Sequence, residues 1–242
     1  MKTYVSLHFF IALLITMNSM YAQQASELPP EVELYGQGDP DLTSGDGYRL
    51  RPEAAVAFEQ MKAAALKDSI RIQVVSSFRD YAHQNRIWER KYKRFRESGL
   101  RPQESIEKII EYSTIPGTSR HHWGTDIDLI DGNADTTGDV LVPSKFHGKG
   151  PFCKFLEWMK KHSEEYGFYL VYTDNYNRKG FHYEPWHYSY RPLSKPYLDA
   201  YKKLDLLQKL EEAELMGSEH FTQEFMKRYI EQNILNINPD LL

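Results

Sequence analysis

Residues Ser119 to Ile130 read SRHHWGTDIDLI, and this stretch decides how the rest of the chain is interpreted. Its last six residues alternate like a strand, which places Asp126 and Asp128 on the same face. A second cluster, Tyr183 to Tyr188 (YEPWHY), adds a carboxylate and an imidazole. Zinc hydrolases need three protein ligands and an open position for water. They also need a nearby carboxylate that transfers protons, and the two clusters contain each of these parts.

The residue pattern does not indicate which of the two aspartates would bind a metal. One of them is enough to bind a metal directly, and the other could sit behind it and orient an imidazole. Glu184 and His187 are three residues apart, which would place them on one face of a helix. Pro185 disfavours a helix at this point, so we expect a bend at the end of a strand.

The order of predicted elements around the clusters is mixed α and β without regular βαβ alternation, which favours the α+β class. Periodicity and turn residues define the elements. We expect helices over residues 52–67, 80–97, 103–112, 152–166, 197–215 and 221–234, and strands over 70–76, 125–130, 168–172 and 181–190, the last two joined by a turn at 174–177.

The chain divides by composition into four parts. Residues 1–22 combine Lys2 with a short apolar run, a pattern typical of a secretory signal peptide. The run is shorter than the ~20 residues of a membrane span. We therefore expect a periplasmic or extracellular protein without a span after cleavage. Residues 23–46 are rich in Gly, Pro, Ser and Asp and predict an extended lead-in. A domain over 47–192 and a helical C-terminal extension over 193–242 follow.

The composition excludes some classes of protein. The chain has 242 residues and 41% hydrophobic residues, enough to bury a core without disulfides. Its single cysteine, Cys153, excludes an intramolecular disulfide and a cysteine-based zinc finger. With 30 basic and 34 acidic residues, we expect no nucleic-acid partner. The sequence does not indicate the oligomeric state.

Three motifs in order carry a resemblance to a known family. Ser119 to Asp128 resembles the Ser-x-His-x-x-Gly-x-Ala-x-Asp motif of the VanY-type zinc D-alanyl-D-alanine carboxypeptidases. Glu184 to His187 is similar to the family's Glu-Pro-Trp-His. Upstream, Ser76 to Tyr81 (SSFRDY), followed by Gln84, resembles its Ser-Gly-Tyr-Arg-Ser-Tyr segment. The resemblance covers roughly Leu50 to Pro192.

The resemblance implies roles for the matching residues. His121, Asp128 and His187 match the zinc ligands, and Glu184 matches the catalytic base. The small Ala of the family motif is Asp126 here. This departure adds negative charge beside the metal, which could strengthen metal binding or blur which aspartate is the ligand. The motif match favours Asp128 as the ligand, with Asp126 as a candidate to orient an imidazole.

Further positions match the family's substrate site. Arg79 matches an arginine that binds substrate or steadies the oxyanion, and a guanidinium suits both tasks. Gln84 and Ser119 match positions that line the site, and Trp186 is a candidate to line it as well.

The implied protein is an exported zinc metallopeptidase that trims the stem peptides of peptidoglycan at a C-terminal D-alanine. The implied fold is of the Hedgehog/DD-peptidase type, a small antiparallel sheet flanked by helices. Two alternatives stay open. The same chemistry serves L,D-carboxypeptidases and L-alanyl-D-glutamate endopeptidases of this fold, and some members of the fold are zinc-containing binding modules without turnover.

Overall fold

The computed structural model describes residues 28–242, so the predicted signal peptide lies outside the described residues. Within residues 28–242, no helix is both long and apolar enough to cross a membrane. The helices are α2 (Glu31–Leu34), α3 (Pro52–Lys67), α4 (Tyr81–Glu97), α5 (Pro102–Ile109), α6 (Cys153–His162), α7 (Arg191–Tyr201), α8 (Leu206–Glu211) and α9 (Gln223–Tyr229). The strands are β1 (Thr43–Gly45), β2 (Tyr48–Leu50), β3 (Ile72–Ser76), β4 (Asp126–Asp131), β5 (Phe168–Leu170) and β6 (His187–Tyr190).

An antiparallel sheet of order β3-β4-β6-β5 positions the sequence clusters. Strand β4 pairs with β6 so that Asp128 lies opposite His187, and with β3 so that Asp128 also lies opposite Ser76. Strands β1 and β2 form a separate small hairpin. The predicted α+β class with a small antiparallel sheet is confirmed. The three sequence motifs therefore meet on neighbouring strands.

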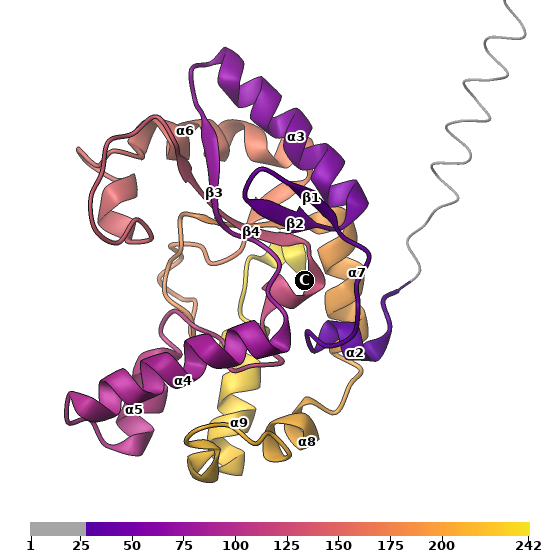
Figure 1. Ribbon diagram of the computed structural model, residues 1–242, viewed down its shortest axis with the longest axis vertical. Coiled ribbons are helices and arrows are strands. Elements are labelled where there is room, and N and C mark those ends of the chain that lie inside the picture. Colours follow the sequence, from indigo (N-terminus) through magenta and orange to yellow (C-terminus); the bar gives the residue numbers. More distant parts are fainter. Residues whose placement is uncertain (1–27) are drawn as a thin grey trace, which may run out of the picture.

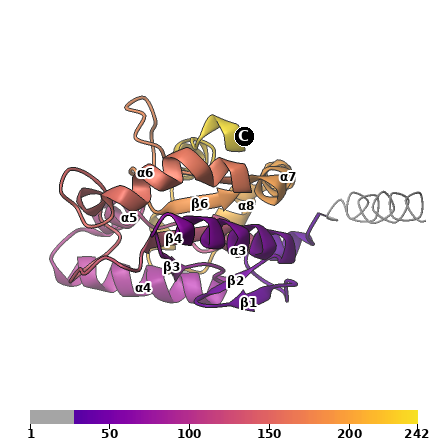
Figure 2. The same cartoon turned by 90° about the horizontal axis from the view of Figure 1, so that it is seen from above.

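Helices cover the sheet on more than one side. Figure 1 shows α4, α5, α8 and α9 in the lower half of the molecule, and α3, α6 and strands β3 and β4 in the upper half. Turned by 90°, α6 lies above β6 and β4, and α4 lies below them (Figure 2). Helix α3 has the predicted bounds. It begins at Pro52, whose fixed φ suits the first turn, and it buries Phe58 and Met61 completely.

The segment between β5 and β6 differs from the prediction. Of the strand expected over residues 181–190, only His187–Tyr190 pairs with neighbours, and residues 173–186 form turns and irregular backbone. Pro185 has no N–H to donate to a ladder, and Gly180 has a positive φ of 81°. The expected bend therefore comes directly before the strand, not at its end.

The lead-in segment is more ordered than an extended chain. It contains the short helix α2 and strand β1, and it buries Leu34 and Tyr35 in the core. The Tyr81 N–H at the start of α4 donates to the Gly36 carbonyl over 2.6 Å. The prediction of an extended lead-in over residues 23–46 is wrong for residues 28–46, because α2 buries an apolar side chain against the domain.

The C-terminal extension packs on the domain and shares its hydrophobic core, which runs from Leu34 to Leu241. Helix α7 starts at Arg191, and Pro196 lies inside it. The helix expected over residues 197–215 is interrupted between α7 and α8. The one expected over 221–234 is α9 followed by a π-helical turn, Ile230–Ile234.

Candidate functional site

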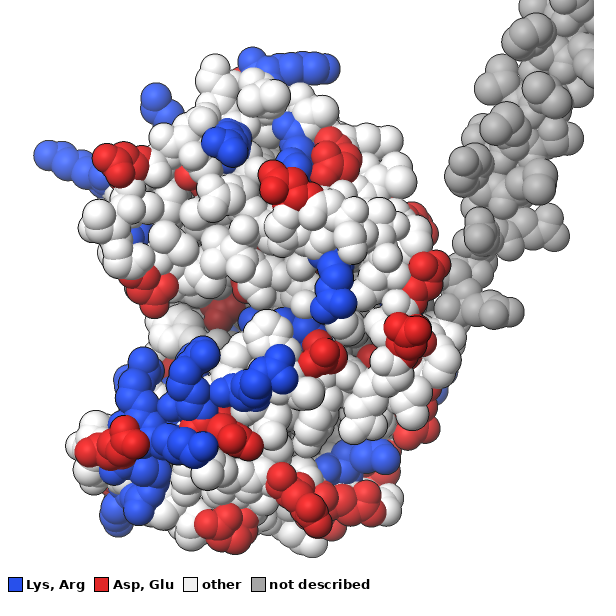
Figure 3. Space-filling model, in the orientation of Figure 1, with Lys and Arg blue, Asp and Glu red and all other residues white. Residues whose placement is uncertain are grey.

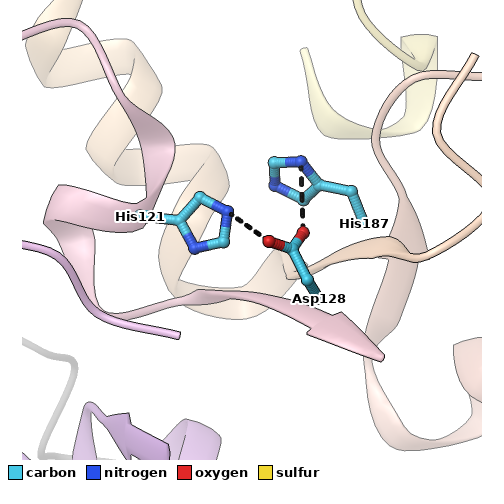
Figure 4. A group of neighbouring side chains, drawn as sticks. All are labelled: His121, Asp128 and His187. Atoms are coloured by element: carbon cyan, nitrogen blue, oxygen red, sulfur yellow. Dashed lines mark ion pairs between the residues drawn. The ribbon is translucent and has the colours of Figure 1, made fainter. Parts of the chain in front are cut away.

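His121, Asp128 and His187 converge at the centre of the sheet (Figure 4). Asp128 comes from β4, His187 is the first residue of β6, and His121 lies in the 3-10 turn Arg120–Trp123 just before β4. One ligand atom from each residue lies within 4.8 Å of the others, and all three side chains are buried. His121 Nε2 is 3.4 Å from Asp128 Oδ2, and His187 Nδ1 is 3.8 Å from Asp128 Oδ1.

Hydrogen bonds fix which nitrogen of each imidazole faces the group. His121 donates from Nδ1 to the Ser77 carbonyl over 2.8 Å, which leaves the Nε2 lone pair directed at Asp128. His187 donates from Nε2 to Asp126 over 3.0 Å, which leaves Nδ1 on the side of Asp128. An acceptor on the far nitrogen is the usual way in which proteins orient a metal-binding histidine.

Asp126 is fully buried behind His187 and is surrounded by donors. Its Oδ2 accepts from Arg120 Nε over 2.9 Å as well as from His187. Its Oδ1 accepts from the hydroxyls of Thr125 and Ser189, at 2.8 and 2.7 Å. Burial acts against a charged carboxylate, but Arg120 and His187 outweigh it and lower the pKa of Asp126. Asp126 therefore orients the His187 ring through Nε2, whereas Asp128 lies on the Nδ1 side of that ring.

The three converging residues suit zinc. Two histidines and one aspartate form a zinc-binding donor set that leaves one position open. Neighbouring ligands of a tetrahedral zinc ion lie about 3.4 Å apart for bonds of ~2.1 Å, and His121 and Asp128 match this distance. Asp128 Oδ1 is buried and has no hydrogen-bond partner among residues 28–242. An orphaned carboxylate oxygen of this kind is costly unless a cation binds it.

Glu184 lies beside the three residues, just before β6. Its side chain is buried, with the residue 6% exposed, and Oε2 is 3.0 Å from His187 Nδ1. Burial raises the pKa of the Glu184 carboxyl above its usual range. A carboxylate with a raised pKa beside a metal site is suited to accept and return a proton near neutral pH.

The residues predicted to bind substrate line the same cavity, which has a volume of about 570 Å³. Arg79 follows β3 and donates from Nη1 to Ser76 over 3.2 Å, while its Nε has no partner within the described chain. Gln84 donates to the Thr114 carbonyl and keeps its Oε1 unpaired, and the Ser119 hydroxyl is unpaired too. Three polar side chains with free hydrogen-bonding capacity thus border the cavity.

Aromatic side chains form the remaining walls. Trp186 is buried, borders the cavity and packs against Phe146 with ring centroids 5.8 Å apart. Tyr172 lies edge-on to the His187 ring at 5.1 Å. The structure therefore brings together every site residue that the sequence predicts, with Asp126 one layer behind the cavity.

Two further side chains beside the site were given no functional role from the sequence. Arg120 bridges Asp126 and Ser189, and its guanidinium also borders the cavity. His122 accepts from the Gly117 N–H over 3.1 Å and donates to the Arg79 carbonyl over 2.6 Å. Both occupy variable positions of the first motif. The only sequence signal for them is that residues 120–123 are four successive basic or aromatic side chains.

Fold and site together place a His₂Asp group and a buried glutamate at one cavity, and zinc hydrolases use groups of this kind. The model of the VanY D-alanyl-D-alanine carboxypeptidase family matches residues 47–193, and the chain belongs to this family.

Known proteins similar to this chain are consistent with that assignment. It is 23% identical over 146 residues to a D-alanyl-D-alanine carboxypeptidase of Enterococcus faecalis, covering 60% of this chain and 49% of the relative. The chain spans 46–63% of the length of the curated relatives it matches.

Two solved structures show the fold. A mutant of the vancomycin resistance D,D-pentapeptidase VanY in complex with Zn(II) is 24% identical, with a TM-score of 0.52 over 64% of this chain and 80% of that one. VanYB in complex with D-alanine-D-alanine is 22% identical, with a TM-score of 0.53 over 70% of this chain and 91% of that one. The predicted Hedgehog/DD-peptidase-like fold is confirmed.

Proposed function

We propose that this chain is a zinc-dependent carboxypeptidase that removes the C-terminal D-alanine from peptidoglycan stem peptides. One observation carries the proposal. The buried carboxylate of Glu184 and the three converging residues His121, Asp128 and His187 face the same cavity as Arg79. Zinc bound by those three residues would act as a Lewis acid and lower the pKa of a water molecule.

Glu184 is the proton carrier of the proposed reaction. It accepts a proton from the attacking water and delivers it to the leaving amine of D-alanine. Its burial and its raised pKa support both transfers, because the carboxylate accepts a proton more readily than an exposed glutamate would.

Recognition of the free C-terminus is the task proposed for Arg79 and Ser119, while Gln84 Oε1 would accept from an N–H of the substrate. Each has a polar atom without a partner among the described residues, and a carboxylate can accept from a guanidinium and a hydroxyl together. The Arg79 guanidinium could instead stabilise the oxyanion. The two complexes with Zn(II) and with D-alanine-D-alanine, found for VanY proteins of this fold, support both the metal and the substrate class.

The test compares wild-type protein with Glu184→Gln on defined muropeptides, followed by mass spectrometry. We expect zinc-dependent loss of one D-alanine from a pentapeptide, and a fall of about 10³-fold or more in kcat for the variant with zinc retained. An amidated C-terminus should block cleavage by a carboxypeptidase. Cleavage of the amidated peptide points to an endopeptidase, and release of D-alanine only from tetrapeptides points to an L,D-carboxypeptidase.

Export is the second part of the proposal. The pattern of residues 1–22 and the peptidoglycan substrate of the family support a periplasmic or extracellular location. N-terminal sequencing of the protein from the cell envelope should start after Ala22. Recovery of the full-length chain from the cytoplasm would contradict it.

A further inference from the structure

The cavity continues outward from the catalytic residues along a wall of positive charge. Its cations are Arg90, Lys91 and Arg94 of α4 and Lys108 of α5, which we call the basic wall. In Figure 3, Lys and Arg side chains gather over the region of α4 and α5, at the lower edge of the hollow in the molecule's face. The chain as a whole has a net charge of −4, so this cluster does not follow from a generally basic composition.

The α4 residues of the basic wall lie along the same side of the helix as Gln84, which borders the candidate site. Gln84, Ile87, Lys91 and Arg94 follow one another at spacings of three and four residues, so they form one stripe along α4. At 1.5 Å per residue, Lys91 and Arg94 lie about 10 and 15 Å beyond Gln84 along the helix axis. An extended peptide covers about 3.3–3.6 Å per residue. A substrate that leaves the site along this wall therefore passes it about three to four residues before the scissile bond.

Three of these cations lack an acidic partner in the described part of the chain. Arg90, Lys91 and Arg94 form no ion pair there, whereas Lys108 pairs with Glu111 over 2.7 Å. The neighbouring Lys93, which points away from the cavity, pairs with Glu89. The side of α4 that faces the cavity therefore carries three cations without an acidic partner among the described residues.

Of the four cations of the basic wall, Lys91 is the least exposed. This side chain is half-buried and donates from Nζ to the Ser113 hydroxyl. Burial and the nearby Arg94 lower the pKa of Lys91. Four carboxylates border the cavity: Asp128 and Glu184 of the candidate site, Glu111 in its pair with Lys108, and Asp139. None of the four forms an ion pair with Lys91 in the described part of the chain, so this cation can attract an external anion.

We propose that the basic wall binds a free carboxylate on a substrate residue about three to four positions before the scissile bond. The enzyme would then prefer stem peptides with acidic upstream residues over the same peptides with those carboxylates amidated. This inference rests on the proposed carboxypeptidase function and names the substrate subclass of the same site.

The test uses two synthetic pentapeptides that end in D-alanyl-D-alanine and differ only in a carboxylate or a carboxamide about three residues before the scissile bond. For wild-type protein with zinc at low salt, we expect kcat/KM to be about tenfold higher for the carboxylate peptide. The preference should shrink in 0.5 M salt, because these charges are partly exposed and are screened. In Arg90→Gln/Arg94→Gln the ratio of the two kcat/KM values should fall to about one or two. Lys91→Met should lower the ratio as well.

Arg86→Gln/Lys93→Gln is the matched control. Both residues lie on α4 outside the cavity, and the double variant removes the same charge. We expect it to keep the wild-type ratio. A ratio near one in the wild type, or an equal fall in both double variants, overturns the basic wall as a substrate site. Inhibition by poly(glycerol phosphate) with no discrimination between the peptides assigns the wall to an anionic polymer and overturns the inference too.

Failure of the proposed function gives a different result. If neither peptide is cleaved by zinc-loaded protein, that function is wrong. Calorimetric titration with the same two peptides then tests the basic wall. Tighter binding of the carboxylate form that is lost in Arg90→Gln/Arg94→Gln supports the wall, and equal affinity for both forms overturns it.

Discussion

Asp126 accepts a hydrogen bond from His187 Nε2 over 3.0 Å and thereby turns the other nitrogen of that ring toward Asp128. The position of Asp126 is itself fixed by Arg120 and by the hydroxyls of Thr125 and Ser189. The two aspartates of β4 thus differ in task although they share a strand face. One borders the cavity and the other orients an imidazole.

This difference predicts unequal losses of zinc affinity. Asp128→Ala should abolish stoichiometric zinc binding, because a direct ligand is removed. Asp126→Asn should weaken binding by about 10- to 100-fold, as is typical for the partner of a metal-binding histidine. Competition with a chromophoric chelator measures both affinities. Asp131→Asn, at the other end of β4, is the control and should bind like wild type. Retention of zinc by Asp128→Ala together with its loss in Asp126→Ala would exchange the two assignments.

The hydrogen bonds of His122 lead to a second prediction, that this residue positions Arg79. The buried ring connects the Gly117 N–H to the Arg79 carbonyl. Replacing it with Phe leaves both backbone groups without a partner and should cost about 1–3 kcal/mol of unfolding free energy each. The loop that carries Arg79 should loosen, which raises KM for the stem peptide.

The conservative variant His122→Gln separates this effect from simple loss of packing. Its amide can donate and accept, so it should recover part of the lost stability and most of the KM. Urea unfolding and steady-state kinetics give the two values. An unchanged KM in a folded His122→Phe would show that the ring does not position Arg79.

Local sequence patterns predicted the parts of the fold that local forces determine. The bounds of α3 follow from Pro52 and from apolar residues at helical spacing. The strand β4 follows from the alternation in TDIDLI. The metal-binding candidates could be named because their motifs resemble those of a known family, and the structure brings all three to one point.

Long-range contacts explain what the sequence did not predict. The bond between Asp126 and His187 joins residues 61 positions apart, so no local pattern indicates which aspartate orients the ring. His122 acquires its role only because the loop of Arg79 and the turn at Gly117 come to lie on either side of it. Helix α2 is short, and its stability comes from burying Leu34 rather than from its own propensity.

The contacts of the C-terminal extension lead to a third prediction, that the extension stabilises the loop before the first motif. The Tyr229 hydroxyl accepts from the Ile115 N–H over 3.0 Å and shares a hydrogen bond with Thr118 Oγ1. Tyr229→Phe should lower the free energy of unfolding by about 1–3 kcal/mol, because two buried polar groups lose a partner. Tyr176→Phe, whose side chain is 90% exposed, is the matched control and should change little. Equal midpoints of urea unfolding for both variants would contradict a supporting role for the extension.

The fourth prediction concerns the melting temperature with and without zinc. A ligand that binds only the folded state at 100 times its Kd adds about 2.7 kcal/mol of stability. For a chain of this length, zinc should therefore raise Tm by roughly 5–10 °C over protein treated with a chelator. His121→Ala and His187→Ala should lose this response, because each removes one of the three converging ligand atoms. Cys153→Ser should keep it, since the only cysteine lies outside the group. A zinc-dependent Tm in both histidine variants would place the metal elsewhere in the chain.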